Sequence, residues 1–274
     1  MTLVKTIING KEIEVERDRW ALDVAREMGI FIPTFCYHPA LQPYGACRLC
    51  VVEVTRGKWR WLTTSCDLPI REGLSIKTNT PEVIKSRRMA LELLWARAPQ
   101  AECVQSLAKK LGVERPRFAV RDDLGKCILC GLCVRICDQL IGVSALSFSR
   151  RGVERRVETP FGKASDSCIG CNACVEVCPT GHIVSADRDS VRYIETWNTR
   201  LDMLMCDVCG KAYMPVKEFE YIKNKLGKEI SLEQVCPVCR RKQTIVRLER
   251  ATATKENNVN LVGSHLSYEH NSSV

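Results

Sequence analysis

Cysteine is the residue type in this sequence with the most chemical potential, at 17 of 274 residues. Sixteen of them form four groups with short internal gaps, and Cys103 stands apart. The groups are Cys36, Cys47, Cys50 and Cys66; Cys127, Cys130, Cys133 and Cys137; Cys168, Cys171, Cys174 and Cys178; and Cys206, Cys209, Cys236 and Cys239. The start of the chain has no export signal, so we expect a reducing, cytoplasmic compartment and thiolates that bind metal rather than disulfides.

The second and third groups are an internal repeat, with 41 residues between corresponding cysteines. Each reads Cys-x2-Cys-x2-Cys-x3-Cys, the bacterial ferredoxin spacing, in which the fourth cysteine ligates the other cluster. The spacing predicts two 4Fe–4S clusters; a pair of unrelated zinc knuckles is the alternative. Pro179 follows the second run as this pattern requires, whereas Asp138 follows the first. The predicted ligand sets are Cys127, Cys130, Cys133 and Cys178 for one cluster, and Cys168, Cys171, Cys174 and Cys137 for the other.

The first group has the spacing Cys36-x10-Cys47-x2-Cys50-x15-Cys66, which differs from that of plant ferredoxins. Three cysteines from a loop and a fourth from a later strand suit a 2Fe–2S cluster, with zinc as the alternative. His38 is a second candidate ligand, although an ordinary surface position explains it more simply.

The fourth group, Cys206-x2-Cys209-x26-Cys236-x2-Cys239, has the paired knuckles of a zinc ribbon. It predicts one structural zinc ion, and iron is the alternative, either as a single ion or in a further 4Fe–4S cluster. A closed four-sulfur site leaves no open position for Lewis-acid catalysis. We expect Cys103 to be a plain buried thiol.

The elements around these cysteines predict an α+β chain. Residues 1–80 read as a small β-rich domain with a hairpin at Asn9-Gly10 and a helix that Asp18 caps and Gly29 ends. Residues 81–123 read as a helical linker, with helices over 81–97 and 101–111. The remaining segments are a dicluster domain at 124–195 with a hairpin inside 139–167, a four-cysteine metal ribbon at 201–242 with a helix over 216–226, and a disordered tail at 251–274.

The formal net charge of +9 suggests a nucleic-acid partner, but it counts every cysteine as a neutral thiol. Four four-thiolate sites at about −2 each bring the loaded chain to roughly +1. No apolar run reaches the ~18 residues of a membrane span. The sequence has no dinucleotide-binding motif, P-loop or nucleophile arrangement. We therefore predict a carrier of electrons with no catalytic residues, no nucleic-acid partner and no transmembrane segment.

Two segments resemble a known family. Ile32-Pro33-Thr34-Phe35-Cys36-Tyr37-His38-Pro39 with Gly45-Ala46-Cys47-Arg48-Leu49-Cys50, and the run from Cys127 to Asp138, are similar to the N-terminal part of the complex I large iron–sulfur subunit. They are equally similar to the diaphorase-type iron–sulfur subunit of NAD-linked hydrogenases, electron-bifurcating ones included. The resemblance covers roughly residues 1–190. It implies a β-grasp 2Fe–2S ferredoxin domain followed by a bacterial-type dicluster ferredoxin fold.

One departure from this family is informative. The family carries a further 4Fe–4S site with one His and three Cys ligands between the two domains, whereas the span from Ala98 to Phe118 offers only Cys103. We expect this cluster to be absent. The C-terminal ribbon resembles that of ferredoxin-like subunits in formate hydrogenlyase-type complexes.

The resemblance implies an electron-transfer subunit of a soluble multisubunit oxidoreductase. Its expected partners are a flavin/NAD(P)-binding subunit, a catalytic subunit of the nickel–iron hydrogenase type or, second, of the formate dehydrogenase type, and ferredoxin. A free-standing polyferredoxin is one alternative, and a metal-stabilised nucleic-acid-binding protein is another.

Overall fold

The computed structural model describes residues 2–227 and 233–262. The chain divides into two compact units. Met1–Arg188 with Arg192–Leu201 forms the first unit, and Asp189–Val191 with Asp202–Val274 forms the second. Helices and sheets are mixed in the described residues, as the α+β prediction requires. Within the described ranges, no helix combines the length and the apolar character needed to cross a membrane.

A five-stranded sheet opens the first unit, in the order β2-β1-β5-β3-β4. β1 runs parallel to β5, and the other neighbours are antiparallel. Asn9 and Gly10 join β1 to β2 with φ angles of 50° and 85°, so the predicted hairpin turn is confirmed. The strands are β1 (Leu3–Ile8), β2 (Lys11–Glu16), β3 (Val51–Arg56), β4 (Trp59–Thr64) and β5 (Ser75–Lys77).

Helix α1 (Ala21–Glu27) contributes Leu22 and Val24 to the same core as the buried face of this sheet. The helix ends before Gly29, which has a φ of 74°, as predicted. The prediction that Asp18 caps it is wrong. Asp18 has a left-handed backbone, and its amide donates to Ile70 O at 2.9 Å, so the chain turns into the helix two residues later.

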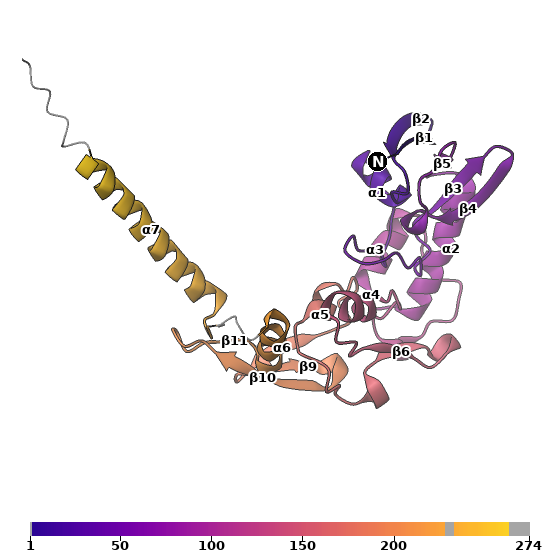
Figure 1. Ribbon diagram of the computed structural model, residues 1–274. Coiled ribbons are helices and arrows are strands. Elements are labelled where there is room, and N and C mark those ends of the chain that lie inside the picture. The colour runs from indigo at the N-terminus through magenta and orange to yellow at the C-terminus, as the bar shows by residue number, and fades with distance from the viewer. Residues whose placement is uncertain (1, 228–232, 263–274) are drawn as a thin grey trace, which may run out of the picture. The chain divides into compact units, whose positions relative to one another are not determined.

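Two helices follow the sheet, and both were predicted. Helix α2 (Pro81–Arg97) begins after Thr80, whose hydroxyl accepts from the Val83 amide at 3.4 Å, and α3 (Glu102–Lys110) follows it. Figure 1 shows the pair between the five-stranded sheet and the short helices α4 and α5. Leu91 and Val104 are fully buried where they pack. The segment expected as a helical linker is therefore part of the core of the first unit.

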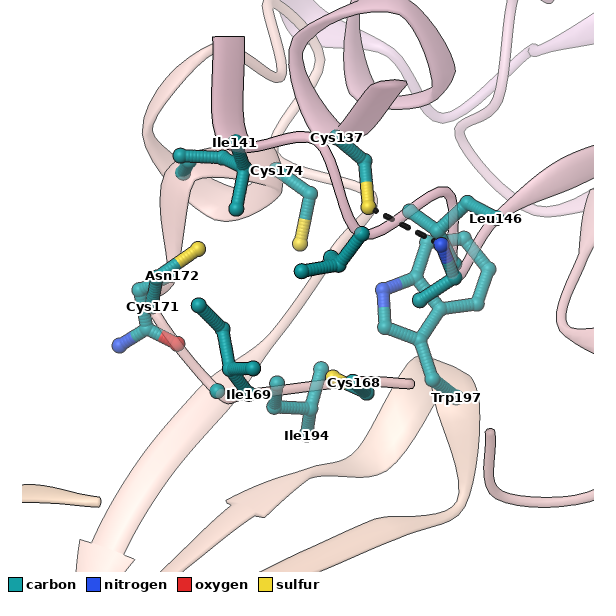
Figure 2. Close-up of a pocket in the computed structure, with 14 residues that line it drawn as sticks. Cys137, Ile141, Leu146, Cys168, Ile169, Cys171, Asn172, Cys174, Ile194 and Trp197 are labelled. Atoms are coloured by element: carbon teal, nitrogen blue, oxygen red, sulfur yellow. Dashed lines mark hydrogen bonds between the residues drawn. The ribbon is translucent and has the colours of Figure 1, made fainter. Parts of the chain in front are cut away.

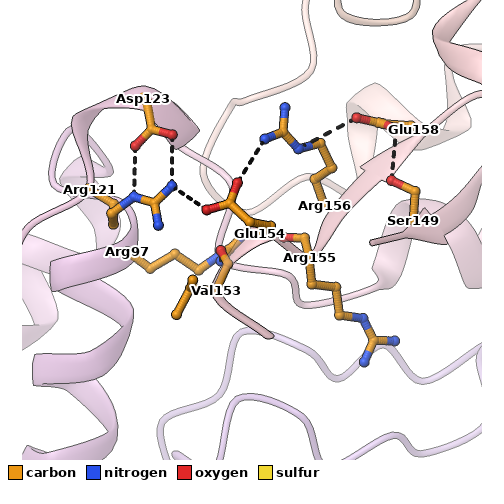
Figure 3. Close-up of polar contacts among 9 residues, drawn as sticks. All are labelled: Arg97, Arg121, Asp123, Ser149, Val153, Glu154, Arg155, Arg156 and Glu158. Atoms are coloured by element: carbon orange, nitrogen blue, oxygen red, sulfur yellow. Dashed lines mark hydrogen bonds and ion pairs between the residues drawn. The ribbon is translucent and has the colours of Figure 1, made fainter. Parts of the chain in front are cut away.

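A polar network holds the end of this helical segment against the hairpin of β6 (Ser147–Ser149) and β7 (Arg156–Glu158), which lies inside the predicted insert (Figure 3). The Arg121 guanidinium pairs with Asp123 at 2.8 Å and with Glu154 at 2.9 Å. Arg97, at the end of α2, donates to the Arg155 carbonyl at 2.5 Å. The chain that leaves the helices is thus tied down on both sides of the hairpin.

The rest of the first unit is short elements around the two repeated cysteine runs. Its helical pieces are η2 (Asp122–Leu124), α4 (Leu132–Arg135), the π-helix η3 (Ile136–Ile141), η4 (Gly152–Glu154), η5 (Pro160–Gly162), α5 (Ala173–Glu176) and η6 (Glu195–Trp197), whereas η1 (Ser65–Asp67) follows β4 in the five-stranded-sheet region. A buried core of Ala145, Leu146, Ile183, Ile194 and Trp197 lies among these cysteines.

Strands β8 (Ser185–Arg188), β9 (Val191–Ile194), β10 (Thr199–Met205) and β11 (Ala212–Pro215) form a sheet in the order β11-β10-β9-β8. The second unit contains α6 (Val216–Leu226), where the sequence predicts a helix, and α7 (Pro237–Val262). The expected disordered tail differs from this structure over 251–262, which prolong α7. That stretch has no Gly or Pro to stop a helix. Residues 263–274 lie outside the described residues.

Candidate metal centres

The four cysteines of the first group lie together at the base of the β3–β4 hairpin. β3 starts directly after Cys50 and β4 ends just before the turn that carries Cys66, so antiparallel pairing brings these two cysteines together. Cys36 and Cys47 come from the loop between α1 and β3. All four are buried, with exposed fractions between 0% and 4%.

These cysteines are arranged as two close pairs. The sulfurs of Cys36 and Cys47 are 3.4 Å apart, and the thiols of Cys50 and Cys66 are hydrogen-bonded to each other. A 2Fe–2S cluster takes four thiolates, two on each iron. The donor set and its pairing therefore fit such a cluster.

Backbone amides point at the sulfurs of the first pair. The Phe35 amide lies 3.5 Å from Cys47 Sγ, and the Cys47 amide lies 3.4 Å from Cys36 Sγ. The Cys36 thiol, aided by the amides of Phe35 and Leu49, lowers the pKa of Cys47 to about 5. The lowered pKa favours the thiolate of Cys47, which is the form that binds metal.

The repeated runs share their backbone conformation as well as their spacing. Leu129 and Gly131 in the first run have φ angles of 54° and 71°. Gly170 and Asn172, at the corresponding positions of the second run, have φ angles of 75° and 59°. Two left-handed residues around each central cysteine curl the run into a loop, so both runs form the same kind of concave cradle.

Each run forms a cavity with three of its own cysteines, and the fourth cysteine of that cavity comes from the other run. One cavity, with about 350 Å³ of empty space, is lined by Cys127, Cys130, Cys133 and Cys178. The other, with about 360 Å³, is lined by Cys137, Cys168, Cys171 and Cys174. Figure 2 shows the sulfurs of Cys137, Cys171 and Cys174 directed into the second cavity. Four cysteines that line an apolar cavity fit the donor set of a cubane cluster.

The two cavities have one wall in common, because Trp197 lines both. Burial raises the pKa of Cys130 to about 12 and that of Cys174 to about 11. These thiols are therefore neutral in the metal-free chain, so loading either site with iron releases protons.

Cys137, the cysteine that the first run contributes to the cavity of the second run, lies on a π-helix, an element that recurs at functional sites. The Ala145 amide donates to Cys137 Sγ at 3.3 Å. Asp138, which stands where the second run has proline, accepts from the Ser144 hydroxyl at 2.6 Å. The aspartate thus fixes the turn that follows the cysteine by a hydrogen bond rather than by a proline ring.

The fourth group is built from two separate turns of the second unit. Cys206 and Cys209 follow β10, and Gly210, with a φ of 67°, closes their turn. Cys236 directly precedes α7, and Cys239 lies in its first turn. The Cys236 amide donates to Cys206 Sγ at 3.3 Å and lowers the pKa of Cys206 to about 6, with the amides of the Cys206 turn helping.

The sulfurs of this group lie much closer together than those of a cluster-sized cavity. All four are within 4.8 Å of one another, and those of Cys209 and Cys236 are 3.9 Å apart. A tetrahedral site with metal–sulfur bonds of about 2.3 Å has sulfurs about 3.8 Å apart. The group is therefore shaped for one metal ion. Over residues 2–227 and 233–262, it alone among the cysteine groups is this compact.

Two other residues that the sequence singled out, His38 and Cys103, lie outside these four groups. His38 Nδ1 accepts from the Ala40 amide at 3.2 Å, so one ring nitrogen is used within its own loop. Cys103, on α3, is half-buried against the core that contains Cys130, and burial raises its pKa.

Three arginines near the cysteine loops were not identified from the sequence. Arg87, Arg97 and Arg135 donate to carbonyls in or beside these loops.

Comparison with known families matches both iron–sulfur regions of the first unit. A 2Fe-2S iron-sulfur cluster binding domain matches residues 2–81, and a 4Fe-4S dicluster domain matches residues 126–182. These ranges contain the first three cysteine groups. The fourth group lies beyond both.

Several curated relatives share these regions. An NADH-quinone oxidoreductase subunit of Rhizobium meliloti is 31% identical over 234 residues, which is 76% of this chain and 27% of the relative. The HndD subunit of the NADP-reducing hydrogenase of Solidesulfovibrio fructosivorans is 33% identical over 67% of this chain and 36% of its own length. The NADH-ubiquinone oxidoreductase 75 kDa subunit of Reclinomonas americana is 31% identical over 67% and 29%. The chain thus spans about a third of these relatives or less.

Among solved structures, a chain from the NAD+-reducing [NiFe]-hydrogenase in the H2-reduced state matches with a TM-score of 0.51 and 26% identity. The match covers 81% of this chain and 97% of that one. The resemblance predicted from the sequence is thereby confirmed. The chain contains a 2Fe–2S cluster binding domain followed by a 4Fe–4S dicluster domain, and over these regions it is similar to iron–sulfur subunits of an NADP-reducing hydrogenase and of NADH-ubiquinone oxidoreductase, and to a chain of an NAD+-reducing hydrogenase structure.

Proposed function

We propose that this chain is an electron-transfer subunit that relays electrons between a flavin/NAD(P)-binding subunit and the catalytic subunit of a multisubunit oxidoreductase. Its own residues bind and space the clusters, and they perform no chemistry on a substrate. When bound, the clusters supply one-electron redox chemistry.

The observation that carries this proposal is how the cysteine groups share their cores. Cys36 and Cys47 of the first group lie in one continuous apolar core with Cys130 of the second. A second core contains Cys133 and Cys137 together with Cys168 and Cys174 of the third group. Neighbouring groups thus meet through packed apolar side chains, which is the arrangement that a chain of electron carriers needs.

The proposed ligand sets follow the cavities and the close pairs. One 2Fe–2S cluster takes Cys36 with Cys47 on one iron and Cys50 with Cys66 on the other. Two 4Fe–4S clusters occupy the two cavities, each with three cysteines of one run and the fourth of the other. The compact group of the second unit holds one structural zinc ion, with iron as the alternative.

We propose a nickel–iron hydrogenase as the host complex, with formate dehydrogenase second and ferredoxin as a further partner. The similarity to a hydrogenase subunit and to a chain of a hydrogenase structure supports this order. The flavin partner is expected at the 2Fe–2S end of the chain, and the catalytic partner at the dicluster end. The proposed compartment is the cytoplasm, because the clusters need reduced thiolates.

The test is metal and spectroscopic analysis of the chain prepared without oxygen. We expect about 10 iron atoms and about one zinc ion per chain. Electron paramagnetic resonance of the reduced protein should resolve one 2Fe–2S and two 4Fe–4S signals. Anaerobic co-purification should recover flavin-containing and hydrogenase-type subunits. A chain that folds with zinc alone, or with disulfides, would contradict the proposal.

A further inference from the structure

Two buried arginines reach the first cysteine group from two helices that lie outside its own domain. Arg87 on α2 donates from Nη2 to the Val51 carbonyl at 2.8 Å, directly after Cys50. Arg135 on α4 donates from Nη2 to the Cys36 carbonyl at 2.6 Å and from Nη1 to the Gln42 carbonyl at 2.6 Å. The two guanidinium groups thus hold both ligand segments of the proposed 2Fe–2S site.

The positive charges of these arginines have no ordinary counter-charge. Arg87 is 2% exposed and Arg135 is 8% exposed. Among the described residues, no carboxylate lies within 4.0 Å of either guanidinium. Each also keeps a buried Nε without a hydrogen-bond partner. A buried charge is costly unless another charge compensates it.

Arg87 is charged at neutral pH, and Arg135 makes a contact that suits a charged side chain. Burial lowers the pKa of Arg87 to about 10, partly offset by the nearby Cys50 sulfur, so the group stays protonated. The guanidinium of Arg135 lies 5.0 Å from the centre of the Tyr44 ring, a cation–π contact that suits a charged arginine. The uncompensated positive charge is therefore a lasting property of this part of the fold.

A loaded 2Fe–2S site would supply the missing counter-charge. Four thiolates around an oxidised 2Fe–2S core leave a net charge near −2, and reduction by one electron brings it near −3. Building on the proposed function, we propose that Arg87 and Arg135 are positioning residues of the 2Fe–2S site, which hold its loops through backbone carbonyls and raise its reduction potential by favouring the more negative, reduced state.

The arginines at the other cysteine loops differ in this respect. Arg192 donates to the Gly170 carbonyl at 2.8 Å, but it is paired with Asp187 at 2.7 Å, so its charge is already matched. Arg97 donates to the Cys127 carbonyl at 3.2 Å and is only half-buried. Arg87 and Arg135 differ from both: they are buried and have no carboxylate partner, and their guanidinium groups contact the carbonyls of the first group's loops, although Arg135 itself lies between Cys133 and Cys137.

The experiment is a redox titration of the complete loaded chain, followed by electron paramagnetic resonance of the 2Fe–2S signal. R87Q and R135Q each remove one buried charge, and the double variant removes both. We expect the double variant to have at least tenfold less reduced cluster at a fixed solution potential, a shift of about 59 mV to lower potential for a one-electron couple. Each single variant should shift in the same direction by less.

R48Q is the matched control. Arg48 lies between Cys47 and Cys50 but is exposed to water, so removing its charge should move the potential far less than R87Q or R135Q does. R87K and R135K keep the charge while losing the planar donor geometry, and they should retain most of the wild-type potential. If a glutamine variant fails to assemble, Arg→Met at the same position, which fills the space without charge, takes its place.

The outcomes separate the inference from the proposed function. Wild-type protein without a 2Fe–2S signal would refute the proposed function. A normal wild-type signal, with the potential of the double variant unchanged or raised, would overturn only the role of Arg87 and Arg135. A shift in R48Q as large as in the buried variants would do the same, because it would show that burial does not matter.

Discussion

The cysteine groups of the two units use the same ligand but differ in the space that they enclose. In the dicluster region, four sulfurs line each of two apolar cavities with about 350 and 360 Å³ of empty space. In the second unit, four sulfurs lie within 4.8 Å of one another. The dicluster runs and the group of the second unit each begin with a Cys-x2-Cys pair. This spacing alone therefore does not determine whether a cluster or a single metal ion is bound.

The backbone between the cysteines accounts for the difference. Each run of the dicluster region has two residues with a left-handed backbone, one on either side of its second cysteine. Two residues separate the second cysteine from the third, and the fourth cysteine of each cavity comes from the other run. The ribbon closes its first pair with a single left-handed residue, Gly210, and brings the second pair from the start of α7. The packing differs too. The ribbon's buried core is Val235 with three of its own cysteines, so the metal is expected to hold that module together.

The largest effect is expected when a run loses the cysteine that it contributes to the cavity of the other run. We expect Cys137→Ala to abolish the cluster of the third group and to lower iron from about 10 to about 6 atoms per chain. The first-run cluster should survive, because its fourth ligand is Cys178. Iron analysis and electron paramagnetic resonance of the reduced variant provide the measurement.

Cys178→Ala is the reciprocal change and should abolish the cluster of the second group instead. Cys103→Ser is the control and should keep all the iron. If Cys137→Ala removed the cluster of its own run, the two runs would be independent and the crossed cavities would be misassigned.

Removing a ribbon ligand should affect the second unit alone. Cys236→Ala leaves three ligands, and we expect the loss of about one metal ion per chain with cluster iron unchanged. Structural zinc binding contributes about 10–16 kcal/mol in zinc-finger peptides, so the start of α7 should lose its protection against hydrogen exchange. Metal analysis with hydrogen exchange tests this, and an intact ribbon without metal would contradict it.

A core substitution in the first unit sharpens the comparison in the other direction. Leu91 is fully buried in the core shared by Cys36, Cys47 and Cys130. Leu91→Ala should cost about 2–5 kcal/mol of stability without removing any metal. Denaturant unfolding of the oxidised protein measures this. Leu93→Ala, at an exposed position of the same helix, is the control and should change stability little.

Much of the fold could be predicted from short stretches of the sequence. The Asn9-Gly10 turn, the helix over 81–97 and the helix over 216–226 follow from residues next to one another in the sequence, and all three are confirmed. Asp18 failed as a cap because a distant contact, to Ile70, fixes its backbone in another conformation. The sequence predicts a disordered tail from residue 251 and no helix where α7 lies, because the polar composition of the tail is typical of disorder, whereas a polar composition alone does not end a helix.

The cysteine spacing predicted which residues are candidates, but not what surrounds them. Arg87 and Arg135 act on carbonyls 36 and 99 residues away in the sequence. Their acceptors are backbone atoms, which leave no mark in residue type. Only the packing of α2 and α4 against the first cysteine loop reveals them.

The smallest expected effect concerns the start of α2, where Thr80 caps the helix. The Thr80 hydroxyl accepts from the Val83 amide and donates to the buried Glu53 carboxylate at 3.0 Å. Thr80→Ala removes the cap and should cost about 0.5–2 kcal/mol, whereas Thr80→Ser keeps the hydroxyl and should cost less. Thermal unfolding of the oxidised protein compares the two. Equal losses in both variants would show that the methyl group, rather than the cap, holds α2 in place beside the first cysteine group.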